Sequence, residues 1–96
     1  MRDKQLPRII QTAYDWHGGQ DSALYSFAST GGVVWSEDHR RNLIGEIAGC
    51  RGYRYVDPVS DRRETARLDR LEAYIRTARV LYCYESRRMM TRRGGK

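Results

Sequence analysis

The side chains that could carry out chemistry in this sequence are scattered and match no known catalytic pattern. The candidates for a nucleophile, a base or an orienting group are His17, His39, Ser36, Asp38, Cys50 and Cys83. Catalysis requires such groups to be brought together, or paired carboxylates in a cleft. None of them lies in a recognisable nucleophile elbow, and the glycine pairs lack the spacing and the lysine of a phosphate-binding loop. We therefore predict a protein that is not an enzyme.

The two cysteines do not indicate a metal site. Cys50 and Cys83 form no metal-ligand spacing with each other or with His17 and His39. Two reduced and mostly buried thiols are expected, because free cysteine behaves as a small apolar side chain. The sequence therefore predicts no metal site and no cofactor.

Aromatic side chains are numerous for a core of this size. They include Tyr14, Trp16, Tyr25, Trp35, Tyr53, Tyr55, Tyr74, Tyr82 and Tyr84. Many of these rings must be core, but tyrosine and tryptophan, with arginine, are also the usual hot-spot residues of protein interfaces. Stacking on single-stranded nucleic acid is another use for such rings. The predicted partner-binding residues are Tyr74, Tyr82, Tyr84, Arg87, Arg88 and Trp35.

The formal charge of +6 is concentrated at the C-terminus, where residues 87–96 carry basic side chains and no acid. Such a tail can bind nucleic acid or another polyanion. It can equally be a solubilising end that favours a helix C-terminus through the macrodipole. The alternative function is therefore a small DNA- or RNA-binding regulator that uses Arg40, Arg41, Arg92, Arg93 and Lys96.

A helix-turn-helix motif is a specific form of this alternative. Ala28, Gly32 and Val33 match the small residue, the turn glycine and the residue after it. The match then fails, because positions of the recognition helix that should be buried and apolar fall on Asp38 and Arg41. Acidic residues at that helix N-terminus would also repel the DNA backbone.

One long segment, residues 57–90, dominates the predicted fold. It has no glycine or proline after Pro58, and Asp57 can cap its start. Apolar side chains recur at helical spacing at Leu68, Leu71, Ile75, Ala78, Tyr82 and Met89. This pattern predicts one long helix. The alternative for residues 79–85 is a short strand, because valine and tyrosine favour strands.

The remaining segments predict shorter helices over residues 5–17, 22–29 and 37–48, separated by glycines. Residues 33–35 and 52–56 are interpreted as short extended segments, and pairing of the two with each other is one alternative. The predicted fold class is mainly α: a small four-helix single domain over residues 1–90, with a long C-terminal helix, a minor two-stranded extended element and a basic flexible tail at 91–96.

The length of the last helix and the hydropathy of the chain lead to two further expectations. A helix of about 30 residues is about 45 Å long, whereas a compact domain of this size is about 32 Å across. The overhanging end predicts a homodimer through the C-terminal helix. No apolar stretch approaches the roughly 20 residues that span a bilayer, and the N-terminus lacks a signal-peptide run. The expected location is the cytoplasm of a bacterial host cell, with no membrane contact.

Residues 17–31, His-Gly-Gly-Gln-Asp-Ser-Ala-Leu-Tyr-Ser-Phe-Ala-Ser-Thr-Gly, resemble segments of short uncharacterised proteins from phages and prophages. The resemblance implies an accessory protein, a class in which small host-directed inhibitors such as anti-CRISPR proteins are common. Proteins of this kind usually act by binding. The predicted function is therefore a non-enzymatic, phage-encoded accessory protein or inhibitor that contacts a host or phage protein.

Overall fold

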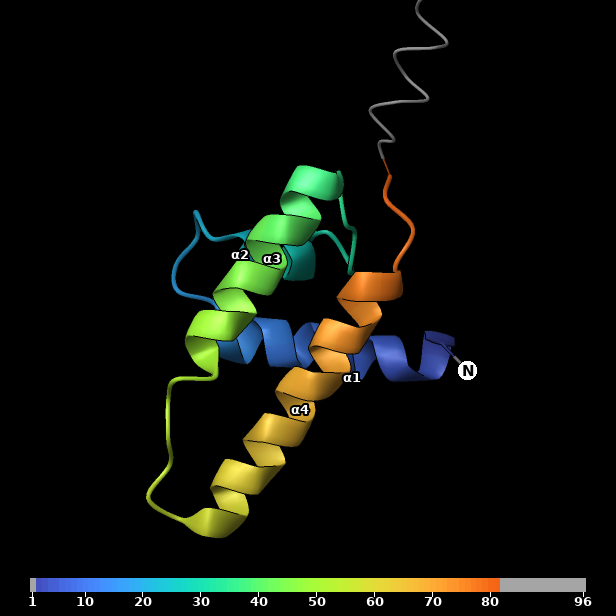
Figure 1. Ribbon diagram of the computed structural model, residues 1–96. Coiled ribbons are helices and arrows are strands. Elements are labelled where there is room, and N and C mark those ends of the chain that lie inside the picture. The colour runs from blue at the N-terminus through green and yellow to red at the C-terminus, as the bar shows by residue number, and fades with distance from the viewer. Residues whose placement is uncertain (1, 82–96) are drawn as a thin grey trace, which may run out of the picture.

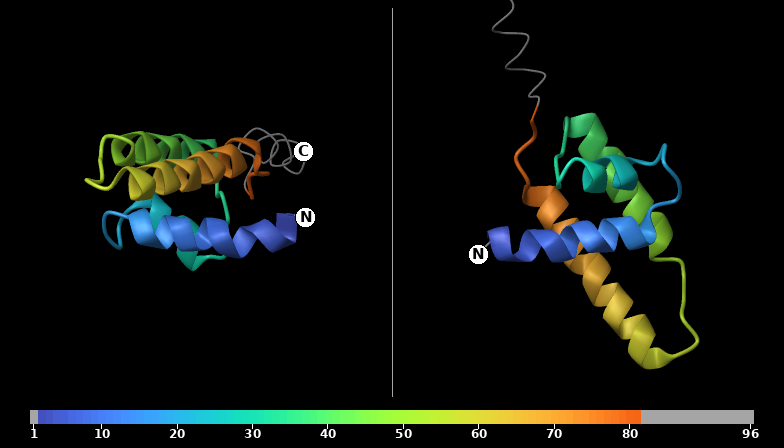
Figure 2. Two further views of the ribbon diagram at one scale, coloured as in Figure 1. Left: turned by 90° about the horizontal axis from the view of Figure 1, so that it is seen from below. Right: turned by 180° about the vertical axis from the view of Figure 1, so that it is seen from behind.

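Four helices build the part of the chain that the computed structural model describes, which is residues 2–81 with side chains from Leu6 onward. They are α1 (Arg2–Trp16), α2 (Ala23–Ser29), α3 (Glu37–Cys50) and α4 (Pro58–Thr77) (Figure 1). Figure 2 shows two layers, with α3 beside α4 in one layer and α1 with α2 in the other. The predicted mainly α, four-helix fold is confirmed.

The helix starts follow from local capping. Ser36 and Asp57 cap α3 and α4, and each side chain accepts the backbone N–H three residues further on. The Asp57 cap was predicted from the sequence. The cap of α2 is Ser22, so this helix begins at Ala23, one residue later than the predicted start at residue 22.

Glycine ends α2 through its backbone conformation. Gly31 and Gly32 have φ angles of +82° and +92°. The Gly31 N–H donates to the Ala28 carbonyl (3.1 Å) and the Gly32 N–H donates to the Phe27 carbonyl (2.8 Å). This pair of hydrogen bonds is a Schellman motif, which satisfies the last carbonyls of a helix and needs a left-handed residue.

The prediction of one helix to residue 90 is wrong, because α4 ends at Thr77. Ala78 turns into the extended region with ψ at 142°. Val80 then forms a parallel bridge with Val34, and the Leu81 N–H donates to the Val34 carbonyl (2.8 Å). Residues 79–81 are thus not helical, as the strand alternative requires, but they form only one isolated bridge at Val80 and no strand, and residues 82–85 lie outside the described residues.

The bridge also corrects the predicted pairing of residues 33–35 with 52–56. Val34 pairs with Val80 instead, and residues 53–55 form an irregular connection between α3 and α4. A helix of 20 residues is about 30 Å long, close to the expected domain diameter. The overhang from which the homodimer was predicted is therefore absent from the described helix, and dimerisation stays a prediction without that argument.

The core lies between the two layers, and every helix contributes to it. Its buried side chains are Ile9, Ala13, Leu24, Phe27, Ala28, Val34, Leu43, Ile47, Leu68, Leu71, Ile75 and Ala78. The predicted stripe of α4 is confirmed at Leu68, Leu71 and Ile75. Among the described helices, none is long and apolar enough to cross a membrane.

Candidate functional site

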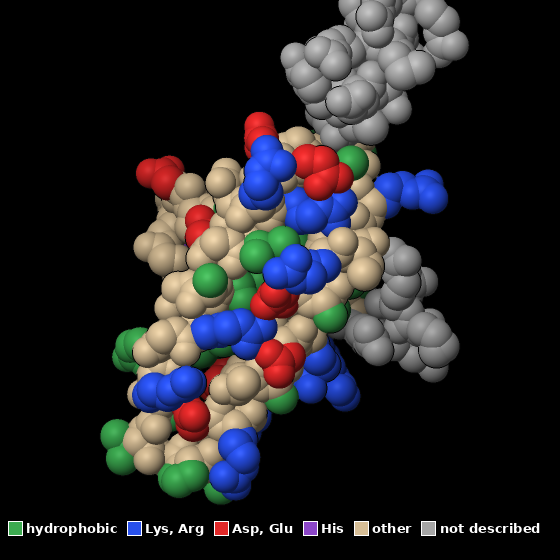
Figure 3. All heavy atoms as spheres, viewed as in Figure 1, with side chains coloured by type: hydrophobic (Ala, Val, Ile, Leu, Met, Phe, Trp, Pro, Cys, Tyr) green, Lys and Arg blue, Asp and Glu red, His purple; other side chains and the backbone are tan. Residues whose placement is uncertain are grey.

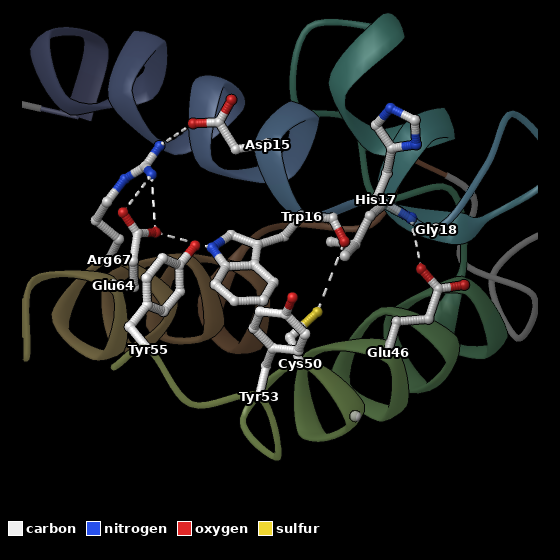
Figure 4. A pocket seen from close by; sticks show the side chains of 12 residues that line it. Asp15, Trp16, His17, Gly18, Glu46, Cys50, Tyr53, Tyr55, Glu64 and Arg67 are labelled. Carbon is white, nitrogen blue, oxygen red and sulfur yellow. Dashed lines mark hydrogen bonds and ion pairs between the residues drawn. The ribbon is translucent and has the colours of Figure 1, made fainter. Parts of the chain in front are cut away.

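A large hollow lies where the end of α1, the second half of α3 and the start of α4 meet, with a volume of about 790 Å³. We call it the aromatic pocket. It is lined by Asp15, Trp16, His17, Gly18, Leu24, Glu46, Gly49, Cys50, Tyr53, Tyr55, Glu64 and Arg67 (Figure 4). This volume falls within the range of about 300–1,000 Å³ that is typical of ligand pockets.

Three aromatic rings form one wall of the pocket. Trp16 lies edge to face with Tyr53 and Tyr55, at ring-centroid distances of 5.9 and 6.3 Å, and the two tyrosine rings are 5.9 Å apart. Figure 4 shows both tyrosine rings next to the indole. Such pairs contribute about 0.5–1.5 kcal/mol beyond their buried area, so the cluster is held in place although Tyr53 is 67% exposed and Tyr55 40% exposed.

A hydrogen-bonded network fixes the indole from behind. The Trp16 Nε1–H donates to Glu64 Oε1 (3.0 Å). Arg67 donates to both Glu64 oxygens (2.9 and 3.1 Å) and to Asp15 Oδ2 (2.6 Å). Burial alone would raise the pKa of Asp15, but the hydrogen bonds from Arg67 and Gln11 outweigh it and lower that pKa. The Asp15 carboxylate is therefore ionised at neutral pH.

Glu46 joins the pocket to the N-terminus of α2. Its two carboxylate oxygens accept the backbone N–H groups of Ala23 (2.8 Å) and Leu24 (2.9 Å). These are the first two N–H groups of the helix, which have no partner within it. A negative charge there also complements the helix dipole, so Glu46 has a structural role and adds a third carboxylate to the lining.

Two of the candidate catalytic residues, Cys50 and His17, line the aromatic pocket. Burial, followed by the nearby Glu46 carboxylate, raises the pKa of the Cys50 thiol, whose Sγ donates to the Trp16 carbonyl at 3.7 Å. His17 Nδ1 accepts the Gly19 N–H at 3.0 Å. The thiol is thus protonated at neutral pH and is a poor nucleophile, since the thiolate is the reactive form.

Three other candidate catalytic residues form hydrogen bonds or ion pairs at or near the start of α3. Ser36 caps α3, and Asp38 pairs with Arg41. His39 Nδ1 accepts the Trp35 N–H (3.0 Å), and its Nε2 lies 3.4 Å from the Ala23 carbonyl. Cys83 lies outside the described residues. Within residues 2–81, no group of three or more histidine, cysteine, aspartate and glutamate side chains could hold a metal ion.

Of the predicted partner-binding residues, the two that the structure describes, Trp35 and Tyr74, do not line this pocket. Trp35 lies in the connection between α2 and α3 and is partly exposed, whereas Tyr74 packs edge to face on the buried Phe27, 6.0 Å between ring centroids. Their common surface stays a prediction, because the other members lie outside the described residues: Tyr82, Tyr84, Arg87 and Arg88.

The predicted nucleic-acid-binding residues have separate surroundings. The Arg40 guanidinium donates to the carbonyls of Ile75 (2.5 Å) and Arg76 (2.9 Å) and to Glu37, so it closes the end of α4. Arg41 is exposed and pairs with Asp38. The remaining three, Arg92, Arg93 and Lys96, lie outside the described residues.

The sequence predicted no site role for Trp16, Tyr53 and Tyr55, although all three were noted as members of the aromatic set. A signal was present, because Tyr53 and Tyr55 alternate with Arg54 in a short segment between Gly52 and Pro58. Such a segment cannot bury both rings in a helical core. What the sequence did not show is that the end of α1 brings Trp16 against them.

Comparison of the chain with protein-family models, with curated protein sequences and with solved structures finds no significant match to any of them. The interpretation of the pocket therefore follows from its own geometry and charge.

Proposed function

We propose that this is a non-enzymatic binding protein whose aromatic pocket receives an arginine or lysine side chain of a protein partner. The observation that carries the proposal is the cluster of half-buried Trp16 with exposed Tyr53 and Tyr55 in the lining of the pocket. Large rings held in place at a surface are the usual anchors of protein interfaces.

An apolar surface continues from the tyrosines toward the start of α4. Tyr53, Tyr55, Val56 and Val59 are exposed, and Val56 is fully so. Figure 3 shows hydrophobic side chains gathered at this lower end of the molecule. Several exposed apolar side chains at one end of a molecule are characteristic of interaction sites, and they support a protein rather than a small polar molecule as the partner.

The charge of the pocket favours a cationic group. Asp15, Glu46 and Glu64 face it with negative charge, against one guanidinium from Arg67. A cation over an aromatic face gains about 0.5–2 kcal/mol, depending on its desolvation. A guanidinium or ammonium of the partner would therefore meet both rings and carboxylates, whereas a carboxylate would be repelled.

Binding without catalysis is supported by the roles of the polar groups. Glu46, Glu64 and Asp15 are held by hydrogen bonds within the fold, and the Cys50 thiol is protonated. The resemblance of residues 17–31 to phage and prophage proteins extends the proposal to a phage-encoded accessory protein or inhibitor. That segment carries His17 of the pocket wall and all of α2.

The cation preference is tested directly with model compounds. In a Trp35→Phe background, Trp16 is the only tryptophan and its fluorescence reports on the pocket. Titration with N-acetyl-arginine amide should change this fluorescence with millimolar affinity, and the neutral N-acetyl-norleucine amide should not. Equal responses to both compounds would remove the cation preference, and no response to either would overturn the assignment of the pocket.

The partner is tested with matched tyrosine variants. Tyr53→Ala with Tyr55→Ala removes the exposed rings, whereas Tyr14→Ala removes a ring that is also 40% exposed but does not line the pocket. Affinity purification from a bacterial lysate should retain a protein with the wild type and with Tyr14→Ala and lose it with the double variant. Recovery of nucleic acid alone, or of the same protein with all variants, would contradict the proposal.

A further inference from the structure

A second hollow lies where α1 crosses α4, and arginine dominates its lining. It encloses about 330 Å³ and is lined by Arg8, Ile9, Gln11, Thr12, Arg63, Arg67 and Arg70. We call it the arginine groove. Figure 2 shows α1 lying across α4, and this crossing brings arginines from residues 8 and 63–70 together. Nothing in the spacing of the sequence indicates that they meet.

Three of these arginines lack the ion pairs that Arg67 and Arg76 form on α4. Arg67 is paired with Asp15 and Glu64, and Arg76 with Glu72. Arg8, Arg63 and Arg70 form no ion pair with any carboxylate whose side chain the structure describes, and Arg63 reaches Asp57 only through a weak electrostatic influence. Apart from the paired Arg67, the groove therefore carries three arginines without an ion-pair partner among the described side chains. Clustered positive charge of this kind is the electrostatic pattern of an anion-binding surface.

We propose that the arginine groove binds the phosphodiester backbone of duplex nucleic acid, independently of base sequence. Arg63 and Arg70 lie seven residues apart on α4, which is two turns or about 10.5 Å. One strand of a duplex carries a phosphate about every 3.4 Å along its axis, so the two arginines are separated by about three phosphate spacings. Arg8 adds a third contact from the opposite helix.

The lining of the groove selects the duplex over other polyanions. No aromatic ring lines it, so it has no platform for the unstacked bases of a single strand. Its apolar side chain, Ile9, is buried. An acidic protein segment would find no apolar anchor here, whereas backbone contacts alone suffice for binding that does not depend on sequence.

The experiment compares two triple variants of the full chain that lose the same charge. The groove variant combines Arg8→Ala, Arg63→Ala and Arg70→Ala, and it removes three guanidiniums from the lining of the groove. The control variant combines Arg54→Ala, Arg62→Ala and Arg79→Ala, and it removes three exposed arginines that do not line the groove. Binding of a 20-base-pair DNA duplex is measured by fluorescence anisotropy from 50 to 200 mM salt, and thermal unfolding checks that both variants fold.

Three phosphate contacts contribute a slope of about −2.7 in log affinity against log salt, which amounts to a change of about 40-fold between 50 and 200 mM salt. The groove variant should lose this contribution and the control variant should keep it. Equal slopes for the two variants would overturn the proposal, because the tail or the overall charge would then account for binding. If the groove variant fails to fold, the test is NMR of the wild-type protein. Addition of the duplex should then change the backbone amide chemical shifts of residues that line the groove, and shift changes confined to other surfaces would overturn the proposal.

Further arms test the nature of the ligand. A single-stranded 20-mer and a polyglutamate peptide should bind with the same affinity to the groove and control variants, and inorganic phosphate at the same phosphate concentration should not compete with the duplex. A groove-dependent loss for polyglutamate or the single strand, but not for the duplex, would overturn the assignment. The proposal is independent of the aromatic pocket, so Tyr53→Ala with Tyr55→Ala should leave duplex binding unchanged.

Discussion

Glu46 is expected to be the carboxylate on which the fold depends most. It accepts two hydrogen bonds from the first N–H groups of α2, although it comes from α3. Ser22 satisfies the next N–H through its side chain, so the start of α2 depends on these two residues. Glu46→Ala leaves two part-buried donors without a partner.

The magnitude follows from the hydrogen bonds. Hydrogen bonds to a charged group contribute about 1.5–3 kcal/mol each, and water can partly replace them at a half-buried helix end. We expect Glu46→Ala to lower the free energy of unfolding by about 2–3 kcal/mol, which for a domain of this size lowers Tm by about 10–20 °C. Glu46→Gln keeps one acceptor oxygen and should lose about half as much.

Thermal and urea unfolding followed by circular dichroism measure this effect. The matched control is Asp21→Asn, which removes a negative charge beside the same helix end without removing a hydrogen bond. It should change stability by less than about 0.5 kcal/mol. Equal losses for Glu46→Ala and Asp21→Asn would show that long-range charge, and not the two hydrogen bonds, accounts for the effect.

Other perturbations test the helix ends. Arg40→Met removes the donor to the last carbonyls of α4. It should lower the free energy of unfolding by about 1.5–3 kcal/mol and speed amide hydrogen exchange in the last turn. The control Arg41→Met removes an exposed ion pair, and it should lower the free energy of urea unfolding by less than about 0.5 kcal/mol. Gly32→Ala places a Cβ 2.9 Å from Leu6 Cδ1 at a φ of +92°, so urea unfolding should show a loss of at least about 1–2 kcal/mol. Burial lowers the pKa of His39 below its usual 6.5, against the opposing effects of the Ala23 carbonyl and Glu46. The unfolded chain then binds the proton first as pH falls, so stability is full above about pH 6.5 and decreases as pH falls through 6.5 toward the lowered pKa. His39→Gln should make the difference between urea midpoints at pH 7.5 and 5.5 smaller, and an unchanged difference would contradict this reasoning.

Much of the fold was predictable because its helices begin at local signals. Ser36 and Asp57 are followed by helix-compatible first turns, and both act as caps. The apolar stripe at Leu68, Leu71 and Ile75 likewise marks a buried helix face. These features depend on neighbouring residues, and periodicity and capping rules detect them.

The end of α4 could not be predicted in the same way because no local residue imposes it. The helix stops where Val80 pairs with Val34 and where Arg40 supplies hydrogen bonds to the last carbonyls. Both partners are far away in sequence. Val80 and the residues after it had a strand preference, but only the tertiary contact decides between a continued helix and an extended segment.

The candidate site was less predictable than the fold, for a related reason. Its aromatic rings come from α1 and from the connection after α3, and its carboxylates come from three helices. No sequence motif links residues so far apart. The tyrosine alternation at Tyr53 and Tyr55 was visible, yet their relation to Trp16 depends on how α1 packs across α4.

Arg67 separates the two proposed binding surfaces. It lines both the aromatic pocket and the arginine groove, and its ion pairs with Asp15 and Glu64 place acidic groups on the pocket side. Through Glu64 it also holds the Trp16 indole. Removing Arg67 would therefore disturb both surfaces together. A nucleic-acid contact is therefore tested by substitutions that leave Arg67 in place, at Arg8, Arg63 and Arg70. A protein contact is tested in the same way at Tyr53 and Tyr55.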